Sequence, residues 1–440
     1  MDTTAWLDAN RKTFIDISKY IWDNPEVALE EEKASQCLAS ALQKQGFAID
    51  RGIGGMPTAF RARWGSGKPI LGFLGEYDAL PGLSQAADCR RKPVVEGGNG
   101  HGCGHNLLGT GAMAAVLALQ QYMKEKRVSG TLVFYGCPAE ETMTGKIRMA
   151  AAGAFRELDV ALTFHPWQFN GVLAMNMQAM NTARFTFHGE PSHAAAAPEL
   201  GRSALDAVEL MNVGANYLRE HITDDVRIHY TITNGGGQPN LVPPLAQSWY
   251  YVRAKDRAKV DSVFDRLCDI ARGAALMTGT TTEIRLETGC WDMLPNRPLC
   301  ELLYSCMEAI PLPEWSAKDR EFAEAAMGGE APLHEGLKPL SETDGTIPGS
   351  SDVSDVSWIV PTAQIGAAAV PMNTACHTWQ FTACAGNSMG QRSMVYAAKV
   401  LALAGTRLLG DPDLIRRAKE AHEQAKNGIV YHTITPRIFS

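Results

Sequence analysis

The sequence predicts an α/β protein in which a discontinuous larger domain carries an inserted α/β sandwich. The larger domain is expected to have a mostly parallel central sheet with helices on both faces. Three observations predict this class. Apolar strands alternate with a glycine-rich loop and a helix up to residue 165, the rhythm of βαβ units. Period-two alternation begins near residue 182, and helical periodicity returns at residue 299. A length of 440 residues suffices for two or three domains.

The first part of the larger domain is predicted in detail. Two amphipathic helices, two strands, a buried helix and two fully apolar strands are expected in that order at residues 6–21, 30–46, 58–64, 69–74, 107–123, 130–136 and 159–165. Gly65, Ser66 and Gly67 favour a hairpin turn between the first two strands. Pro166 is expected to end the last strand. Apolar strands of this kind are typical of a parallel sheet buried on both faces.

The inserted domain is expected over residues 182–297, so that the larger domain comprises residues 1–181 and 298–440. Its alternating strands are predicted at residues 182–188, 227–233, 245–255 and 281–286, and its helices at 204–220 and 260–277. The alternation of apolar and polar residues indicates a sheet with one face exposed to solvent. The chain then loses regularity between residues 331 and 351 and ends on a long helix over 388–408.

Composition excludes several classes of protein. Hydrophobic residues make up 45% and charged residues 20%, which argues against disorder. The net charge of −7 argues against nucleic-acid binding as the main task. The stretch 107–123 is too short to span a membrane, so no membrane association is expected. The first 19 residues contain Asp2, Asp8 and Asp16 and do not resemble an export signal, so we expect a cytoplasmic protein with reduced cysteines.

The glycine-rich segment 100–106 contains Cys103 and His105 just before a predicted helix. Glycine lets the backbone approach closely, and the positive end of a helix favours a thiolate. This pattern suits a metal ligand pair, although a buried cysteine beside a structural histidine has the same appearance.

Glu140 and Glu141 follow directly after the apolar strand 130–136. Adjacent residues on an extended backbone point in opposite directions. One carboxylate can therefore bind a metal while the other faces water as a general base, as metal-assisted hydrolysis requires. A solvated pair of glutamates is the structural alternative.

Three further histidines are weak signals individually. His165 ends a buried strand, His377 lies among small residues, and His193 lies inside the inserted domain, so each is compatible with a packing or capping role. Three neighbouring sheet-edge positions nevertheless supply Cys103 with His105, the two glutamates, and His165. Such mixed ligands suit zinc or manganese.

Two other chemistries have little support in the sequence. Cys376 stands beside His377, but no third group that would orient a nucleophilic pair is evident. The glycines at 100, 102 and 104 do not follow the dinucleotide-binding spacing, and Gly67-Lys68 lacks the upstream glycine of a phosphate loop.

The motifs together resemble the M20 metallopeptidase family over nearly the whole chain, and most closely its amidohydrolase branch. That branch includes aminobenzoyl-glutamate hydrolases and hydrolases of auxin (indole-acetyl-amino acid) conjugates. The resemblance rests on EYDALP (76–81), HGCGHN (101–106), PAEE (138–141), His165, PSHA (191–194) and CHTW (376–379). Relatives outside the branch carry His-x-Asp where this chain has Glu76-Tyr77-Asp78, which leaves open whether Asp78 is a ligand.

The resemblance implies a catalytic domain and a lid domain that also forms a homodimer interface. It implies one or two zinc or manganese ions per subunit, held by Cys103, His105, Glu141, His165 and His377. Glu140 would be the general base, and His193 would reach across the dimer to steady the oxyanion. Asn240 would contact substrate, and Arg253 would hold a substrate carboxylate.

Three functions remain open at this point. The first is hydrolysis of the amide bond of an N-acyl or N-aroyl amino acid, such as aminobenzoyl-glutamate or indole-acetyl-aspartate, by metal-activated water. The second is an aminohydrolase that releases ammonia from an aromatic amine, such as an aminobenzoate, at the same site. The third is a metal-stabilised binding protein without turnover. Against this last function, a structural zinc site is normally closed by four ligands, which gives Glu140 no role.

Overall fold

The computed structural model describes residues 2–343 and 345–439, which form two compact units. The first unit comprises Met1–Met175, Leu294–Gly345 and Asp355–Tyr431, and the second comprises Asn176–Met293, Thr346–Ser354 and His432–Ser440. The domain limits drawn from the sequence stay a prediction. None of the helices in the described part of the chain combines the length and apolar composition needed to cross a bilayer.

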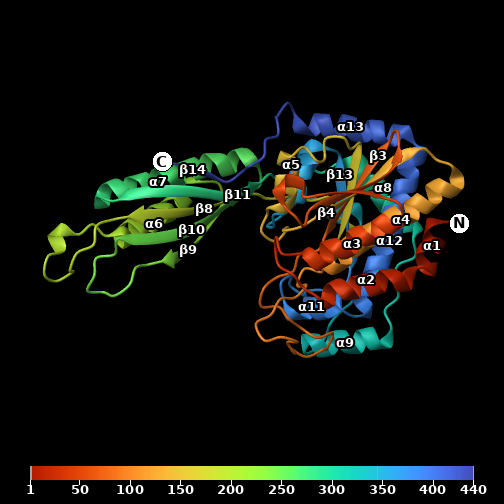
Figure 1. The fold of residues 1–440 in the computed structure, drawn as a ribbon, viewed down its shortest axis with the longest axis horizontal. Coiled ribbons are helices and arrows are strands. Elements are labelled where there is room, and N and C mark those ends of the chain that lie inside the picture. The colour runs from red at the N-terminus through yellow and green to blue at the C-terminus, as the bar shows by residue number, and fades with distance from the viewer. Residues whose placement is uncertain (1, 344, 440) are drawn as a thin grey trace. The chain divides into compact units, whose positions relative to one another are not determined.

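The first unit is built on a seven-stranded sheet in the order β1-β2-β4-β3-β5-β13-β6. Figure 1 labels β3, β4 and β13 of this sheet. Its strands are β1 (Ala48–Arg51), β2 (Phe60–Ser66), β3 (Ile70–Glu76), β4 (Gly130–Cys137), β5 (Val160–Trp167), β6 (Gly171–Val172) and β13 (Thr362–Ala368). The four central strands, β4, β3, β5 and β13, run parallel, whereas β1, β2 and β6 pair antiparallel. Every residue of β3, β4 and β13 is buried, which confirms a mostly parallel sheet covered on both faces.

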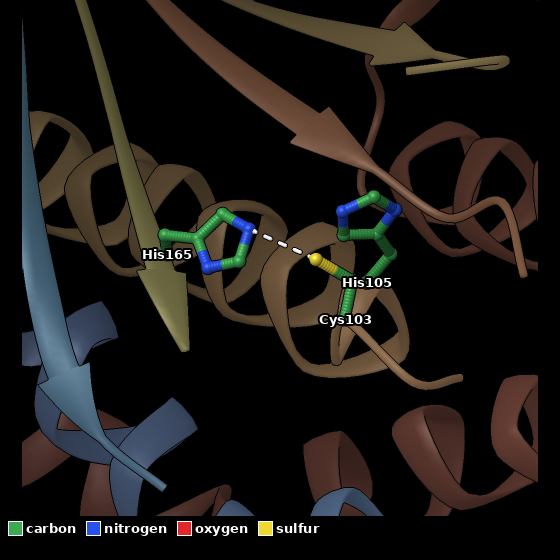
Figure 2. A group of neighbouring side chains, drawn as sticks. All are labelled: Cys103, His105 and His165. Atoms are coloured by element: carbon green, nitrogen blue, oxygen red, sulfur yellow. Dashed lines mark hydrogen bonds between the residues drawn. The ribbon is translucent and has the colours of Figure 1, made fainter. Parts of the chain in front are cut away.

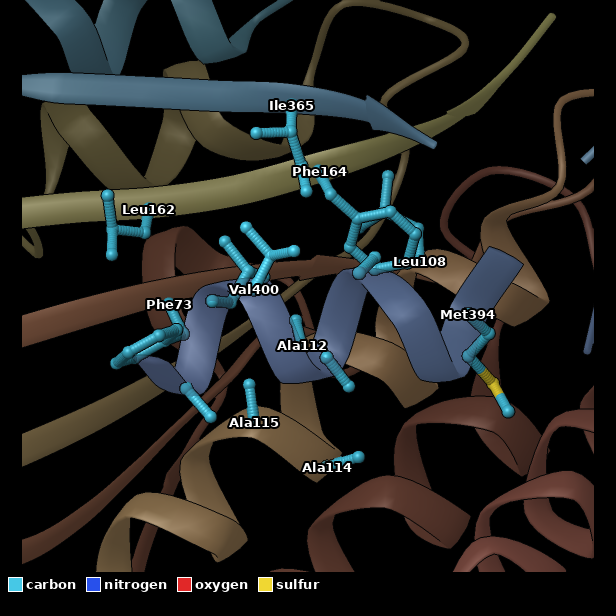
Figure 3. Close-up of a cluster of buried hydrophobic side chains, with 14 of the residues drawn as sticks. Phe73, Leu108, Ala112, Ala114, Ala115, Leu162, Phe164, Ile365, Met394 and Val400 are labelled. Atoms are coloured by element: carbon cyan, nitrogen blue, oxygen red, sulfur yellow. The ribbon is translucent and has the colours of Figure 1, made fainter. Parts of the chain in front are cut away.

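Helices complete the first unit. They are α1 (Thr3–Ala9), α2 (Arg11–Asp23), α3 (Glu32–Lys44), α4 (His105–Lys126), α5 (Gly145–Ala151), α8 (Arg297–Ala309), α9 (Ala317–Met327), α10 (Val353–Ile359, which begins at the end of the second unit), α11 (Trp379–Ala385), α12 (Ser388–Gly410) and α13 (Pro412–Lys426). Short 3-10 turns occur at Ile53–Gly55 and Leu340–Glu342. Figure 3 shows Leu108 and Ala112 of α4 with Val400 of α12 beside Phe164 and Ile365 of the sheet, so two apolar helices bury its centre.

Two local predictions were wrong. The strands at 58–64 and 69–74 do not form a hairpin, because β4 lies between β2 and β3. The wholly apolar β4 gains more from burial on both faces than from an edge position. Pro166 does not end β5 either, since the strand continues to Trp167 beside β13. The β3 ladder ends at Leu162, so β5 then has a partner on one side only, where a proline is tolerated.

The second unit has a five-stranded antiparallel sheet in the order β14-β11-β8-β10-β9. Its elements are β7 (Asn176–Met177), β8 (Ala179–His188), α6 (Ala204–Leu218), β9 (Arg227–Asn234), β10 (Leu245–Ala254), α7 (Arg257–Thr278), β11 (Thr281–Cys290), β12 (Thr346–Ile347) and β14 (Arg437–Phe439), with 3-10 turns at Pro198–Leu200 and Arg219–His221. Alternate residues of β10 are buried, and α6 and α7 pack against this sheet. The predicted period-two pattern is confirmed, but the contribution of β14 was not foreseen.

Candidate metal centre

The candidate ligands gather where the parallel strands of the first unit end. β3 ends at Glu76, and β4 ends at Cys137 just before the two glutamates. β5 carries His165 near its end, and α4 begins at His105. Because parallel strands bring their carboxyl ends to one edge of the sheet, segments far apart in sequence meet there.

Cys103, His105 and His165 form one group whose potential ligand atoms all lie within 4.8 Å of one another (Figure 2). The Sγ of Cys103 is 3.5 Å from Nε2 of His165. Nδ1 of His165 is 2.7 Å from the carbonyl oxygen of Pro166, which assigns the ring proton to Nδ1. Nε2 of His165 therefore offers its lone pair on the side of the cysteine.

A second group joins Cys103 to Glu141 and His377, again within 4.8 Å. Nε2 of His377 is 3.2 Å from a carboxylate oxygen of Glu141. The backbone of His377 adopts a left-handed φ of 61°, and its N–H donates to the carbonyl of Gly102 at 3.0 Å. This bond joins the CHTW segment to the glycine-rich loop, so all five predicted ligands belong to one cluster that shares Cys103.

Two carboxylates flank the His105 ring. Nδ1 of His105 donates to Asp78 at 2.8 Å, and its Nε2 lies 3.3 Å from Glu76. Asp78 also accepts the Glu141 backbone N–H at 2.9 Å, so both of its oxygens are engaged. Asp78 thus orients His105 and Glu141 in the manner of the carboxylates that support metal-bound histidines.

Lys146 was missed by sequence reasoning, and Glu76 was noted in its motif but given no role in the site. Lys146 is fully buried, and its ammonium lies 2.6 Å from Glu76. Burial opposes ionisation of Glu76, but Lys146 and then His105 outweigh it and lower the pKa of that carboxyl. The only sequence signal was the placement of an acid at the end of a strand that is otherwise apolar.

Charge pairing also sets the protonation of the candidate ligands. Burial lowers the pKa of histidines, but Asp78 outweighs it at His105, whose pKa lies well above 6.5. Burial raises the pKa of Glu141, yet the hydrogen bond from His377 outweighs it and the net pKa is lowered. Burial, followed by the charge of His105, lowers the pKa of His165 and favours the neutral ring that a metal requires.

The cluster fits a divalent cation. Among the described residues, Oε1 of Glu141 is buried without a hydrogen-bond partner, which is unfavourable unless another group satisfies it. Nε2 of His105 and Oε2 of Glu76 are buried 3.3 Å apart and form no hydrogen bond. A mixture of thiolate, imidazole and carboxylate donors suits zinc and other first-row transition ions. Cys103 serves both groups of donors, which leaves room for one ion or two.

Glu140 lies beside this cluster and is 7% exposed. One of its carboxylate oxygens belongs to a third group of neighbouring atoms, with Glu76 and His105. The preceding residue, Ala139, has a left-handed φ of 56°, so the chain turns sharply between β4 and the two glutamates. Glu140 and Glu141 consequently join different groups of donors.

The other predicted site residues belong to the second unit. His193 is exposed, and its Nδ1 accepts hydrogen bonds from the backbone of Ala195 and Ala196, each at 3.2 Å. The carbonyl of Asn240 accepts from Ala194 at 2.9 Å, which places Asn240 near His193. Arg253 donates to Ser350 at 3.2 Å. These three residues do not join the cluster of the first unit in the described contacts.

A cavity of about 330 Å³ adjoins the metal cluster at His377. Its lining includes Ser84, Arg91, Glu96, His377, Trp379 and Gln380. An aromatic ring and a guanidinium therefore lie on the border of the candidate centre. Sequence reasoning assigned no role to Arg91, which stands in no recognisable motif, or to Trp379, which was quoted only as the last residue of CHTW.

Comparisons with known proteins agree with this chemistry. The family model of peptidase family M20/M25/M40 matches residues 72–435. One of the subunits of p-aminobenzoyl-glutamate hydrolase from Escherichia coli (strain K12) is 40% identical, over 98% of this chain and 96% of that protein. Xaa-Arg dipeptidase of Mus musculus is 31% identical over 92% of this chain and 87% of that protein.

A solved structure supports the fold. The aminobenzoyl-glutamate utilization protein from Klebsiella pneumoniae superimposes with a TM-score of 0.66 at 17% identity, covering 94% of this chain and 99% of that one. The chain therefore belongs to peptidase family M20/M25/M40 and is a hydrolase of amide C–N bonds.

Proposed function

We propose that the protein is a metal-dependent amidohydrolase that cleaves the amide bond of an N-acyl or N-aroyl amino acid. The observation that carries the proposal is the convergence of three overlapping donor groups on Cys103 and His105, with Glu140 at their border. The E. coli relative, named for hydrolysis of p-aminobenzoyl-glutamate, supports a conjugate of an aromatic acid and an acidic amino acid.

The proposed ligands are Cys103, His105, Glu141, His165 and His377, for one or two zinc or manganese ions. A divalent cation held by these residues would supply a water of lowered pKa, about 7, and would polarise the carbonyl group of the substrate. Glu140 accepts a proton from the attacking water and then transfers it to the leaving amine. General catalysis of this kind contributes about 10²–10⁴ in rate.

His193 is suited to donate a hydrogen bond to the developing oxyanion. Because its Nδ1 accepts two backbone N–H groups, the ring proton resides on Nε2, which is then the donor. We propose that it acts on the active site of a second copy of the chain, with Asn240 contacting substrate and Arg253 holding a carboxylate.

The cavity beside His377 suits the proposed substrate class. Trp379 offers an aromatic face to an aroyl group, and Arg91 offers a guanidinium to a carboxylate. A substrate that carries both features would use both sides of the cavity.

We also propose a homodimer formed through the second unit. Tyr217 on α6 and Leu276 and Met277 on α7 are 74%, 85% and 72% exposed, and β9 is an edge strand. The E. coli relative is named as one of the subunits of its hydrolase, so a hetero-assembly is the competing outcome. Light scattering of the purified protein distinguishes the two assemblies. A homodimer would be seen with this chain alone, whereas a hetero-assembly would need a second protein.

The cytoplasmic location stays a prediction.

The function is tested on protein purified without chelator. Metal content is measured by elemental analysis, and a panel of N-acyl and N-aroyl amino acids is assayed with identification of the products. We expect release of a free amino acid. Release of ammonia instead would establish the aminohydrolase, and bound metal without any turnover would establish the binding protein. Glu140→Gln should lower turnover by about 10²–10⁴ with metal retained, whereas Glu321→Gln on the surface of α9 should change neither.

A further inference from the structure

Glu31 is a buried carboxylate outside the three groups of potential metal ligands. It lies just before α3 and is 0% exposed. Its Oε1 accepts the backbone N–H groups of Leu29 and Ala139, each at 2.9 Å. Its Oε2 accepts the Thr58 hydroxyl at 2.9 Å. One side chain thus links the N-terminal region to the turn that precedes Glu140.

The turn held by Glu31 is conformationally strained. Ala139 and Met143 both adopt left-handed φ angles, 56° and 51°, a conformation that is unfavourable for residues with a Cβ. Two bonds inside the turn help to close it, from Met143 N–H to the Glu140 carbonyl at 2.8 Å and from Thr144 N–H to the Ala139 carbonyl at 3.1 Å. Such strain persists only where neighbouring groups restrain the backbone.

Two buried carboxylates hold the backbone on either side of Glu140. Glu31 accepts the N–H of Ala139, and Asp78 accepts the N–H of Glu141 at 2.9 Å. The Glu140 backbone is therefore fixed at both neighbours by acceptors from other parts of the fold. This double restraint limits the positions that the Glu140 carboxylate can reach.

Keeping a charge at Glu31 is unfavourable for the fold. Burial, followed by repulsion from Asp78, raises its pKa to about 7. A glutamine would avoid this loss of stability and would still accept the N–H groups of Leu29 and Ala139. A buried acid beside another acid is therefore not explained by stability alone.

We propose that Glu31 is a positioning residue for catalysis, which holds the left-handed turn at Ala139 and so places the Glu140 carboxylate against the reacting water. The proposal rests on the proposed function, because it takes Glu140 as the general base. The competing view is that Glu31 merely ties the N-terminal segment to Thr58. On the first view, kcat depends on the contact of Oε1 with Ala139. On the second view, the contact of Oε2 with Thr58 matters equally.

Three variants of the full-length protein separate these views. Glu31→Met fills the space but removes the acceptor for Ala139, and we expect kcat to fall 10- to 100-fold, with KM and metal content within threefold of wild type. Glu31→Gln keeps an acceptor oxygen and should stay within about fivefold in kcat. Thr58→Val removes only the contact to Oε2 and should also stay within about threefold. Equal losses in Glu31→Met and Thr58→Val would overturn the proposal.

A suppressor provides a sharper test. Glycine adopts a left-handed φ without steric penalty, so Ala139→Gly reduces the need for the restraint. We expect the double variant Glu31→Met/Ala139→Gly to recover at least threefold in kcat over Glu31→Met. Failure to recover would overturn the proposal, as would a Glu31→Met protein that does not fold, because Glu31 would then serve the fold itself.

Hydrogen exchange tests the restraint without any substrate. In Glu31→Met, the peptide covering residues 138–145 should exchange at least tenfold faster than in wild type, while the α3 peptide, residues 32–44, should be unchanged. Unchanged exchange at 138–145 would overturn the proposal. If the wild-type protein cleaves no conjugate, the proposed function fails and the catalytic role of Glu31 fails with it. The exchange result still decides whether Glu31 holds the turn.

Discussion

Replacing Glu31 with glutamine should stabilise the protein at alkaline pH and leave it unchanged in acid. The pKa of Glu31 rises from 4.5 to about 7 on folding, chiefly through burial and then through repulsion from Asp78. Glutamine keeps the size of the side chain and an acceptor for the two backbone N–H groups, and its amide can donate to Thr58. The charge is therefore the main property that changes.

The sign and size follow from proton linkage. Because the folded pKa is raised, the folded state binds the proton more tightly than the unfolded state, so wild-type stability falls as pH rises from about 4.5 to about 7. Below pH 4.5 the carboxyl is protonated in both states and has no effect. Above pH 7 the loss reaches its limit of about 3 kcal/mol, at about 1.4 kcal/mol for each pH unit.

The assay is thermal unfolding of chelator-treated wild type and Glu31→Gln between pH 4.5 and 8.5. The first unit has about 300 residues, for which the unfolding entropy is about 0.6 kcal/mol/K. A difference of about 3 kcal/mol therefore corresponds to a Tm about 5 °C higher for Glu31→Gln at pH 8, with no difference at pH 4.5. A Tm difference that is independent of pH, or a wild type more stable at pH 8, would refute the reasoning.

Three other perturbations address the site itself. Glu140→Gln should lower kcat by about 10²–10⁴ with the metal content unchanged, and an active variant would exclude Glu140 as the general base. Asp78→Asn should weaken metal binding by about 10- to 100-fold in chelator competition, because His105 loses its orienting carboxylate, and equal affinity would contradict that role. Arg91→Ala should raise KM about tenfold for N-aroyl glutamates but not for N-aroyl alanines, measured by steady-state kinetics on paired substrates. An equal change for both substrates would argue against a contact between Arg91 and the side-chain carboxylate of glutamate.

Local patterns in the sequence predicted most of the fold. Strand β4 and the long helix α4 could each be predicted from their own residues alone. Both are buried on all sides, so their sequences are continuously hydrophobic. The place of β4 between β2 and β3 was missed, since strand order depends on pairing between distant segments. The C-terminal strand β14 was missed for the same reason, and its three residues carry no distinctive pattern.

Residues with a chemical signature were easier to predict than residues that support them. The five candidate ligands stand in motifs, and the described contacts bring them together. Glu31 is 108 residues away from Ala139 in the chain, and the sequence around either residue does not predict their hydrogen bond. Lys146 gave no signal either, because a lysine in a short helix is ordinarily expected at the surface.

The bond between His377 and Gly102 also bears on biosynthesis. His377 is translated long after Gly102, and β13, which completes the parallel part of the sheet beside β5, is translated only shortly before His377. A ribosome-bound chain that has emerged only as far as Met175 already exposes Cys103, His105, Glu141 and His165 but lacks the fifth donor and the strand beside His165. The donor group of Cys103, Glu141 and His377 is therefore expected to assemble only after His377 has been translated, later than the group of Cys103, His105 and His165.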